Sequence, residues 1–195
     1  MEQAPLLRLV RSAPQAAAPT SVAATEEVRA APAAADEELA AIFRDHTRYV
    51  AAIALRILGR DAEVDDIVQE VFLAALSGLR DRSSPAAVRG WLATVTVRRT
   101  VRRLRQRRLR RLFGLDQKAA PVPAPGVSAE DRVMINRVYE VLDQLPVEQR
   151  VAWALRHLEG EPLDRVAALC ECSLATVKRR IAAAHTTLER RLGDG

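Results

Sequence analysis

Residues 163–181 have the sequence LDRVAALCECSLATVKRRI, which predicts a short helix, a tight turn and a second helix. Gly160 and Pro162 precede this stretch and favour the end of one helix and the start of the next. Ser173 is a good N-cap for the second helix, because its hydroxyl can accept from backbone amides two or three residues later. The second helix is expected to turn an apolar seam toward the first, formed by Leu174, Val177, Ile181, Ala184 and Leu188.

The outward side of this second helix is expected to be small, polar and basic. Helical geometry places Thr176 and Arg179 opposite the seam, with Lys178 and Arg180 on the flanks. Such a helix, seated on a short supporting helix, fits the major groove of DNA. An ordinary helical hairpin with a solvated face is the alternative, because helix-turn-helix patterns are easily mimicked.

The composition predicts an all-α protein that is soluble and cytoplasmic. The chain has 195 residues, of which 49% are apolar and only 4% aromatic, and no segment alternates with the period of a strand. Two cysteines are too few for a secreted disulfide framework, and no apolar run approaches the roughly 20 residues of a membrane span. The N-terminus lacks the pattern of a signal peptide. A net charge of +5 suggests a polyanionic partner.

The pattern divides the chain into two small helical domains and two segments without helical periodicity. Residues 1–35 are rich in alanine and proline and are expected to form a disordered tail. Residues 36–112 form the first predicted domain and residues 132–195 the second. Residues 113–131 contain three closely spaced prolines and are expected to form a semi-extended linker between the domains.

One predicted helix of the first domain has an acidic and polar side. Its apolar stripe faces inward, and the opposite side forms a strip that we call the acidic strip: Asp65, Asp66, Gln69 and Glu70. Acidic residues in a first helical turn are often explained by the helix dipole alone. A strip this continuous is also a candidate docking surface for a basic partner.

The next helix concentrates the positive charge of the first domain. Nine of the fourteen residues from Arg98 to Arg111 are arginine, and residues 36–112 have a net charge of +6 with them and −3 without them. Like charges four residues apart destabilise a helix unless something compensates. Although a solvated helix end is the plainer interpretation, the focus of charge favours a phosphate-binding surface for nucleic acid.

Four motifs, in this order, resemble those of the extracytoplasmic-function sigma factors, the smallest group of the bacterial sigma-70 family. DAEVDDIVQEVFL at 61–73 is similar to the polymerase-binding helix of sigma region 2, and RGWL at 89–92 to the start of its promoter-reading helix. LPVEQR at 145–150 and TVKRR at 176–180 are similar to signatures of region 4. The resemblance covers about residues 38 to 192.

The resemblance implies a promoter-specificity subunit and assigns roles to particular residues. The acidic strip would contact the beta-prime subunit of RNA polymerase core. The loop from Arg80 to Ser84 would hold a base flipped out of the minus-10 element, and the helix after it would lie on that element. An anti-sigma factor would hold such a protein inactive. The minus-10 residues would be Arg80, Asp81, Arg82, Ser83, Ser84, Trp91, Arg98, Arg99, Arg102 and Arg103. The minus-35 residues would be Ser173, Thr176, Lys178, Arg179 and Arg180.

The chain departs from the family pattern at several of these positions. The family has asparagine near 98 and an acidic residue near 102, where this chain has arginine. Arg179 and Ala183 also replace a common serine and arginine. Promoter preference is therefore expected to be atypical. The turn Cys170-Glu171-Cys172 replaces a Leu-Gly-Val-like turn, and small apolar packing explains its thiols better than a metal or redox role.

Two other functions compete with the sigma-factor interpretation. One is a helix-turn-helix regulator that does not engage core polymerase, and the other is a sigma-like decoy that binds an anti-sigma factor. An enzyme is not expected, because the sequence has no glycine-rich phosphate loop, metal cluster or nucleophile–base pair. No cofactor and no bound metal are expected.

Overall fold

The computed structural model describes residues 33–59, 62–78, 84–114 and 128–193, and all its regular elements are helices. Residues 1–32 of the predicted tail and the loop residues 80–83 lie outside the described residues, whereas residues 33–35, predicted as the end of the tail, belong to the first described helix. The helices are α2 (Ala33–Leu58), α3 (Val64–Gly78), α4 (Pro85–Leu112), α5 (Ala129–Gln144), α6 (Val147–His157), α7 (Leu163–Leu169) and α8 (Leu174–Gly193). The predicted all-α fold is confirmed for this part of the chain.

Serine caps determine where three of these helices begin. The Ser84 hydroxyl accepts from the Ala87 amide, and α4 begins at Pro85 directly after this cap. Ser128 caps α5 in the same way, inside the stretch predicted as linker. Ser173 caps α8, as predicted, by accepting from the Thr176 amide at 3.2 Å.

Helices α2, α3 and α4 pack into a three-helix unit, which we call the first unit. Its core is mostly aliphatic, with Phe72 as a buried aromatic side chain. The side chains that lie deepest in it are Ile53, Ile57, Ile67, Val71 and Leu92.

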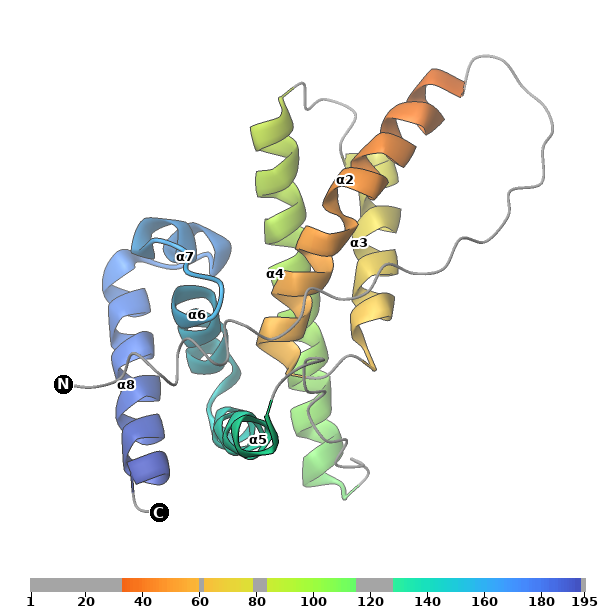
Figure 1. Cartoon of the computed structure of the whole chain (residues 1–195). Helices are drawn as coiled ribbons and strands as arrows, with labels where there is room; N and C mark the ends of the chain where they lie inside the picture. The colour runs from red at the N-terminus through yellow and green to blue at the C-terminus, as the bar shows by residue number, and fades with distance from the viewer. Residues whose placement is uncertain (1–32, 60–61, 79–83, 115–127, 194–195) are drawn as a thin grey trace.

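Helices α5 to α8 form the second unit, in which α8 packs against α5, α6 and α7. In the predicted apolar seam of α8, Val177, Ala184 and Leu188 are buried. Leu174, in the first turn of the helix, is 37% exposed. Figure 1 shows the second unit beside α4, with α6 between α8 and the first unit. Both α6 and α7 contact α4, and α6 also contacts α2.

The two units meet at the C-terminal end of α2. Gly59, with φ of +68°, ends that helix, and a Cβ at Gly59 would lie 2.3 Å from the ring of Tyr139 on α5. The Tyr139 hydroxyl donates to the Arg56 carbonyl at 3.1 Å. Arg150 of α6 donates to the carbonyls of Ile57 and Leu58, each at 2.8 Å. The last carbonyls of a helix have no partner within it, so the second unit supplies part of the cap for α2.

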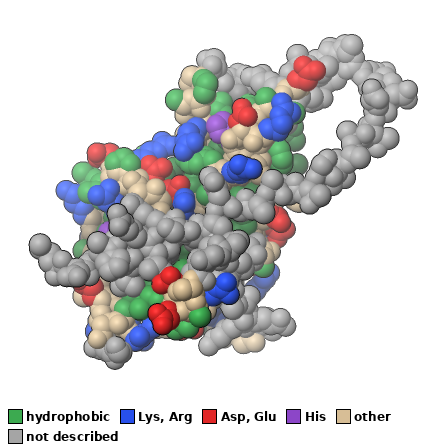
Figure 2. All heavy atoms as spheres, in the orientation of Figure 1, with side chains coloured by type: hydrophobic (Ala, Val, Ile, Leu, Met, Phe, Trp, Pro, Cys, Tyr) green, Lys and Arg blue, Asp and Glu red, His purple; other side chains and the backbone are tan. Residues whose placement is uncertain are grey.

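Among the described residues, no helix is both long and apolar enough to cross a membrane. The face of the molecule in Figure 2 presents basic and acidic side chains close to one another, not in separate blocks of one charge.

Candidate nucleic-acid and partner-binding surfaces

The acidic strip lies on the exposed side of α3. Asp65, Asp66 and Gln69 are exposed and Glu70 is half-buried, as expected from the helical period. The same face continues with Leu73, which is 66% exposed. A carboxylate surface that ends in an exposed apolar side chain is suited to a basic, amphipathic partner. The helical period did not indicate an exposed Leu73, because apolar residues of this helix were expected in its buried stripe.

Arginines of α4 neutralise part of the acidic strip. Arg103 lies 3.2 Å from a Glu70 oxygen and 3.4 Å from an Asp66 oxygen. Arg99 lies 3.4 Å from the other Glu70 oxygen. Both arginines were predicted to contact DNA, and in this structure both face α3.

The remaining predicted minus-10 side chains have different surroundings. Arg98 pairs with Glu171 of the second unit, whereas Arg102 is exposed and pairs with no carboxylate among the described residues. Trp91 packs on the end of α3, where a Cβ at Gly78 would lie 2.4 Å from its ring. Ser84 caps α4, and Arg80, Asp81, Arg82 and Ser83 lie outside the described residues.

The helix-turn-helix forms as predicted from α7 and α8, and most of its outward face is open. Ser173, Lys178 and Arg179 are exposed, and Thr176 is half-buried with its hydroxyl 2.9 Å from that of Ser173. Arg180 is different, because its guanidinium turns toward the Cys172 sulfur at 3.3 Å. Four of the five predicted minus-35 residues therefore lie on or beside one outward face.

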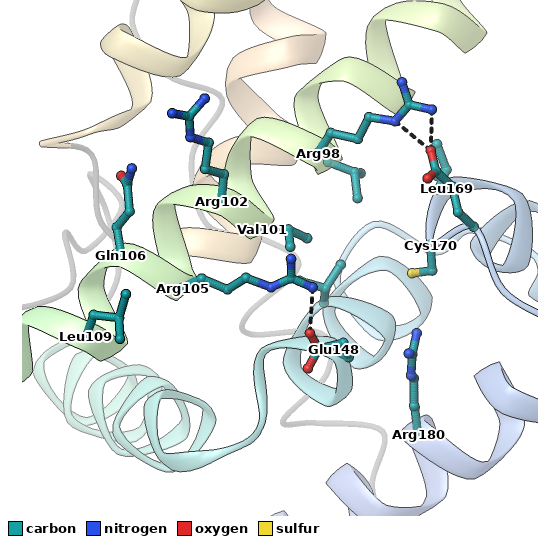
Figure 3. Close-up of a pocket in the computed structure, with 13 residues that line it drawn as sticks. Arg98, Val101, Arg102, Arg105, Gln106, Leu109, Glu148, Leu169, Cys170 and Arg180 are labelled. Carbon is teal, nitrogen blue, oxygen red and sulfur yellow. Dashed lines mark hydrogen bonds and ion pairs between the residues drawn. The ribbon is translucent and has the colours of Figure 1, made fainter. Parts of the chain in front are cut away.

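A cleft of about 600 Å³ separates α4 from the second unit. Apolar side chains and arginines from both units line it. Figure 3 shows Arg98 and Arg105 reaching across it, whereas the Arg102 guanidinium points away from the second unit. Arg105 donates to Glu148 of α6 at 2.8 Å, and this hydrogen bond lowers the pKa of the Glu148 carboxyl. The lining residues are Val97, Arg98, Val101, Arg102, Arg105, Gln106, Leu109, Glu148, Val151, Leu169, Cys170, Glu171 and Arg180.

Two buried arginines on α4 and α6 were not predicted. Arg107 and Arg150 are each only 3% exposed, and both donate to the Leu58 carbonyl. Arg107 also pairs with Glu63, and Arg150 with Asp143. Burial lowers the pKa of Arg150, but the adjacent carboxylate opposes that shift. Sequence periodicity assigns arginine to the surface, so no local pattern indicates these positions.

The two cysteines are free and half-buried. Burial raises the pKa of the Cys170 thiol to about 11, which disfavours the reactive thiolate. Within the described residues, no group of three or more His, Cys, Asp or Glu side chains is placed to hold a metal ion. Both thiols pack, partly buried, against the hydrophobic core.

Two family models match the chain. The model for sigma-70 region 2 matches residues 42–110, within α2 to α4. The model for sigma-70 region 4 matches residues 135–188, within α5 to α8. Each model thus falls within one of the two helical units.

Curated relatives and solved structures agree with these matches. SigM of Mycobacterium tuberculosis, an extracytoplasmic-function RNA polymerase sigma factor, is 31% identical over 153 residues, which are 78% of this chain and 76% of SigM. The probable RNA polymerase sigma factor RfaY of Xanthomonas campestris is 32% identical over 149 residues, 73% of this chain but 37% of RfaY.

Two solved complexes contain chains of similar fold. The sigma factor RpoE of Bartonella quintana, in complex with the anti-sigma factor NepR, matches with a TM-score of 0.60 at 21% identity over 82% of this chain and 97% of RpoE. CnrH, in complex with the cytosolic domain of CnrY, matches with a TM-score of 0.56 at 22% identity, over 82% of this chain and 90% of CnrH.

Proposed function

The chain belongs to the extracytoplasmic-function sigma factors of the bacterial sigma-70 family, and we propose how its two units divide the function of that family. It is a sigma factor that binds RNA polymerase core and directs initiation at specific promoters. The presence of region 2 as well as region 4 disfavours a helix-turn-helix regulator that ignores core polymerase. Sigma factors select promoters and do not themselves catalyse a reaction.

The first unit provides the contact with the polymerase through the acidic strip. The single observation that supports this assignment best is that all four side chains, with Leu73, lie on one accessible side of α3. Its partner is the beta-prime subunit, because the matching motif in the family binds there. Carboxylates with an apolar neighbour suit a basic amphipathic coiled coil.

The minus-10 element is bound by α4 and by the loop that precedes it. Among the predicted minus-10 arginines of α4, Arg102 is the one most available to bind DNA phosphate, since it is exposed and pairs with no described carboxylate. Arg98 can join it when released from Glu171. The loop residues Arg80, Asp81, Arg82 and Ser83, with Ser84, hold the flipped base, and Trp91 supports the adjoining helix.

The minus-35 element is bound by α8 in the major groove. Ser173, Thr176, Lys178 and Arg179 meet the DNA, and Arg180 contacts it from the flank. An arginine at 179 can bind a guanine edge through two hydrogen bonds, a contact that discriminates by about 1–3 kcal/mol. A guanine in the cognate site is therefore expected opposite Arg179.

An anti-sigma factor is the expected regulator of this chain. Support comes from two proteins of similar fold, RpoE and CnrH, which were solved with NepR and with the cytosolic domain of CnrY respectively. The test is whether a protein that copurifies with the chain also displaces it from core polymerase.

Binding to purified core polymerase tests the assignment of the acidic strip. The wild type is compared with Asp66→Asn combined with Glu70→Gln, which removes both charges and leaves their shape. We expect the affinity to fall about tenfold or more, because charge pairs at such interfaces are strongly coupled. These neutral changes avoid placing new positive charge beside Arg99 and Arg103.

The matched control is Glu130→Gln combined with Glu140→Gln, two exposed carboxylates of α5. It changes the net charge equally and should leave core binding intact. Equal affinities for the two double variants would mean that the acidic strip is not the polymerase contact. Failure of the wild type to bind core would exclude the role as a whole.

A further inference from the structure

We propose that the cleft between α4 and the second unit binds a small organic phosphate, with Arg180 holding the phosphate and aliphatic side chains covering the rest of the ligand. This site goes beyond the proposed function, which involves no small molecule. The cleft volume of about 600 Å³ lies within the range of pockets that hold small molecules. Its lining comes from α4, α6, α8 and the end of α7 (Figure 3).

The charge of the cleft favours an anion. Four arginines and two glutamates line it, so its ionised side chains leave a net charge of +2. Two of the arginines pair with the two glutamates across the cleft. Arg102 and Arg180 pair with no carboxylate among the described residues, and Arg102 points away from the second unit. Arg180 is therefore the cation of the cleft that is available to a ligand.

Arg180 can contact DNA from the flank of α8, but in this structure its guanidinium turns into the cleft. Figure 3 shows its side chain extending from α8 toward Cys170. It donates to the Cys172 sulfur at 3.3 Å, and sulfur is a weak acceptor. The pKa of Glu148 is lowered mainly by the hydrogen bond from Arg105 and also by the charge of Arg180. Arg180 therefore faces the opposite wall of the cleft, with donors that a stronger acceptor can occupy.

A phosphate monoester matches this charge and these donors. It carries a charge of about −1.5 to −2 at pH 7, which is close to the charge needed to balance the cleft. Its oxygens can accept two parallel hydrogen bonds from one guanidinium. A single carboxylate carries only half of that charge and would leave the cleft positive.

Aliphatic side chains lie between and beyond the two ion pairs of the cleft. Arg98 and Arg105 stand two helical turns apart on α4, about 10 Å, and Val101 lies between them (Figure 3). Val101 is half-buried, and Leu109, one turn beyond Arg105, is 56% exposed. Val151 of α6 adds to this apolar lining. An apolar ring or chain on the ligand would remove this surface from water, so the ester is expected to carry one.

Promoter DNA is the other source of phosphate that these arginines could bind, and the cleft fits it less well. A duplex presents its phosphates beside sugars and not beside an apolar group that could cover Val101 and Leu109. Glu148 and Glu171 also stand in the walls of the cleft and repel a polyanion. A probe that binds through its phosphate alone, as DNA would, therefore contradicts the proposal.

The test is calorimetric titration of the full chain with naphthyl phosphate, which joins an apolar ring system to a phosphate, in a buffer without phosphate. Inorganic phosphate and naphthol are titrated separately, because each carries one half of that chemistry. We expect a dissociation constant on the order of 0.1 mM for naphthyl phosphate, and values at least about tenfold higher for each half. Adenosine monophosphate is titrated as well. Binding as tight as that of naphthyl phosphate would support a nucleotide as the natural ligand, and weaker binding a more apolar ester.

Two variants with matched controls locate the site. Arg180→Gln should weaken binding of naphthyl phosphate about tenfold, because it removes the charged donors. Arg190→Gln is its control, since it removes an exposed arginine of the same helix that does not line the cleft. Leu109→Gln should weaken naphthyl phosphate about threefold and leave inorganic phosphate unaffected. Its control is Leu112→Gln, because Leu112 is 75% exposed on the same helix but lies outside the cleft lining.

Three results would each overturn the inference. They are no saturable binding of naphthyl phosphate up to about 1 mM, equally tight binding of inorganic phosphate, and equal losses of affinity in Arg180→Gln and Arg190→Gln. The titrations contain neither DNA nor polymerase. Failure of this site is therefore distinguishable from failure of the proposed function.

Discussion

Arg150 is a buried cation that caps a helix to which it is not connected. It lies on α6 but donates to two carbonyls at the end of α2, and its charge is balanced by Asp143. The negative end of a helix dipole favours a cation at this position. One side chain therefore contributes to the stability of α2 and to the contact between the units.

Replacement of Arg150 by methionine should destabilise the protein by about 3 kcal/mol. The change leaves the buried carbonyls of Ile57 and Leu58 with fewer donors, although Arg111 still pairs with Asp143. Arg150→Lys should be intermediate, because a single ammonium cannot reproduce the forked contact. Urea unfolding at neutral pH measures both variants. If Arg150→Met unfolds at the same urea concentration as the wild type, water replaces the guanidinium at these carbonyls without a loss of stability.

Replacement of Glu171 by glycine should not lower the stability of the folded protein, although glycine usually does so in other positions. Glycine relieves the strain at φ of +51°, a gain of about 1–2 kcal/mol, against about 0.5–1 kcal/mol of added flexibility in the unfolded chain. The exposed pair with Arg98 contributes at most about 1 kcal/mol. Thermal melting at 0.5 M salt, where that pair is screened, should give a midpoint equal to or above that of the wild type. A clear decrease would mean that the turn depends on the Glu171 side chain itself.

At the scale of single elements, the arginines on different sides of α4 pair with different carboxylates or with none. Arg99 and Arg103 face the carboxylates of α3, Arg98 and Arg105 face the second unit, and Arg102 is open. Because like charges along one helix repel, these partners also explain how so basic a helix remains folded. The arginines of α4 are therefore not equivalent, although the sequence presents them as one run.

Arg102→Gln and Arg103→Gln should differ in their effect on DNA binding. The first removes a free phosphate contact, so we expect weaker binding to all sequences and a salt slope lower by about one. The second removes a guanidinium already shared by Asp66 and Glu70, so its effect on DNA should be smaller. Anisotropy titrations between 50 and 200 mM salt compare the two at equal net charge. Equal slopes would mean that DNA displaces the carboxylates of α3 freely.

At the scale of the whole molecule, the contact between the units includes a buried ionisable group, the Tyr139 phenol. Tyr139 is 6% exposed, and burial raises its pKa from 10 to about 12, although Arg150 and Arg56 oppose the shift. A raised pKa in the folded state means that the neutral phenol stabilises the fold below pH 10. That contribution is lost as the pH rises through 12.

The free energy of unfolding should therefore fall by roughly 1–3 kcal/mol between pH 10 and pH 12. Tyr139→Phe should remove most of this dependence, at the cost of the hydrogen bond to the Arg56 carbonyl. Burial also raises the pKa of Tyr49, so Tyr49→Phe serves as the comparison. Denaturant unfolding at several alkaline pH values gives the slopes. If the free energy of unfolding of Tyr139→Phe still falls over this pH range, the fall comes from groups other than Tyr139.

Local pattern determined much of this protein. Helical periodicity separated the buried from the exposed side of α3, and Ser173 marked the start of α8, because both depend on neighbours within a few residues. The proposed binding surfaces of α3 and α8 could also be assigned to one side of each helix, because the helical period depends only on residues close together in the sequence.

Only the tertiary structure decided how the charges are distributed among partners. Arg107 is buried and Arg102 is open, although both belong to the same basic run, and Arg150 is buried although it lies on another helix. Their surroundings depend on which helix packs nearby, and the ion pair of Arg98 with Glu171 joins residues 73 positions apart. Coulomb interactions act through space and not along the chain, so the sequence supplied the charged groups while the packing of the two units determined their partners.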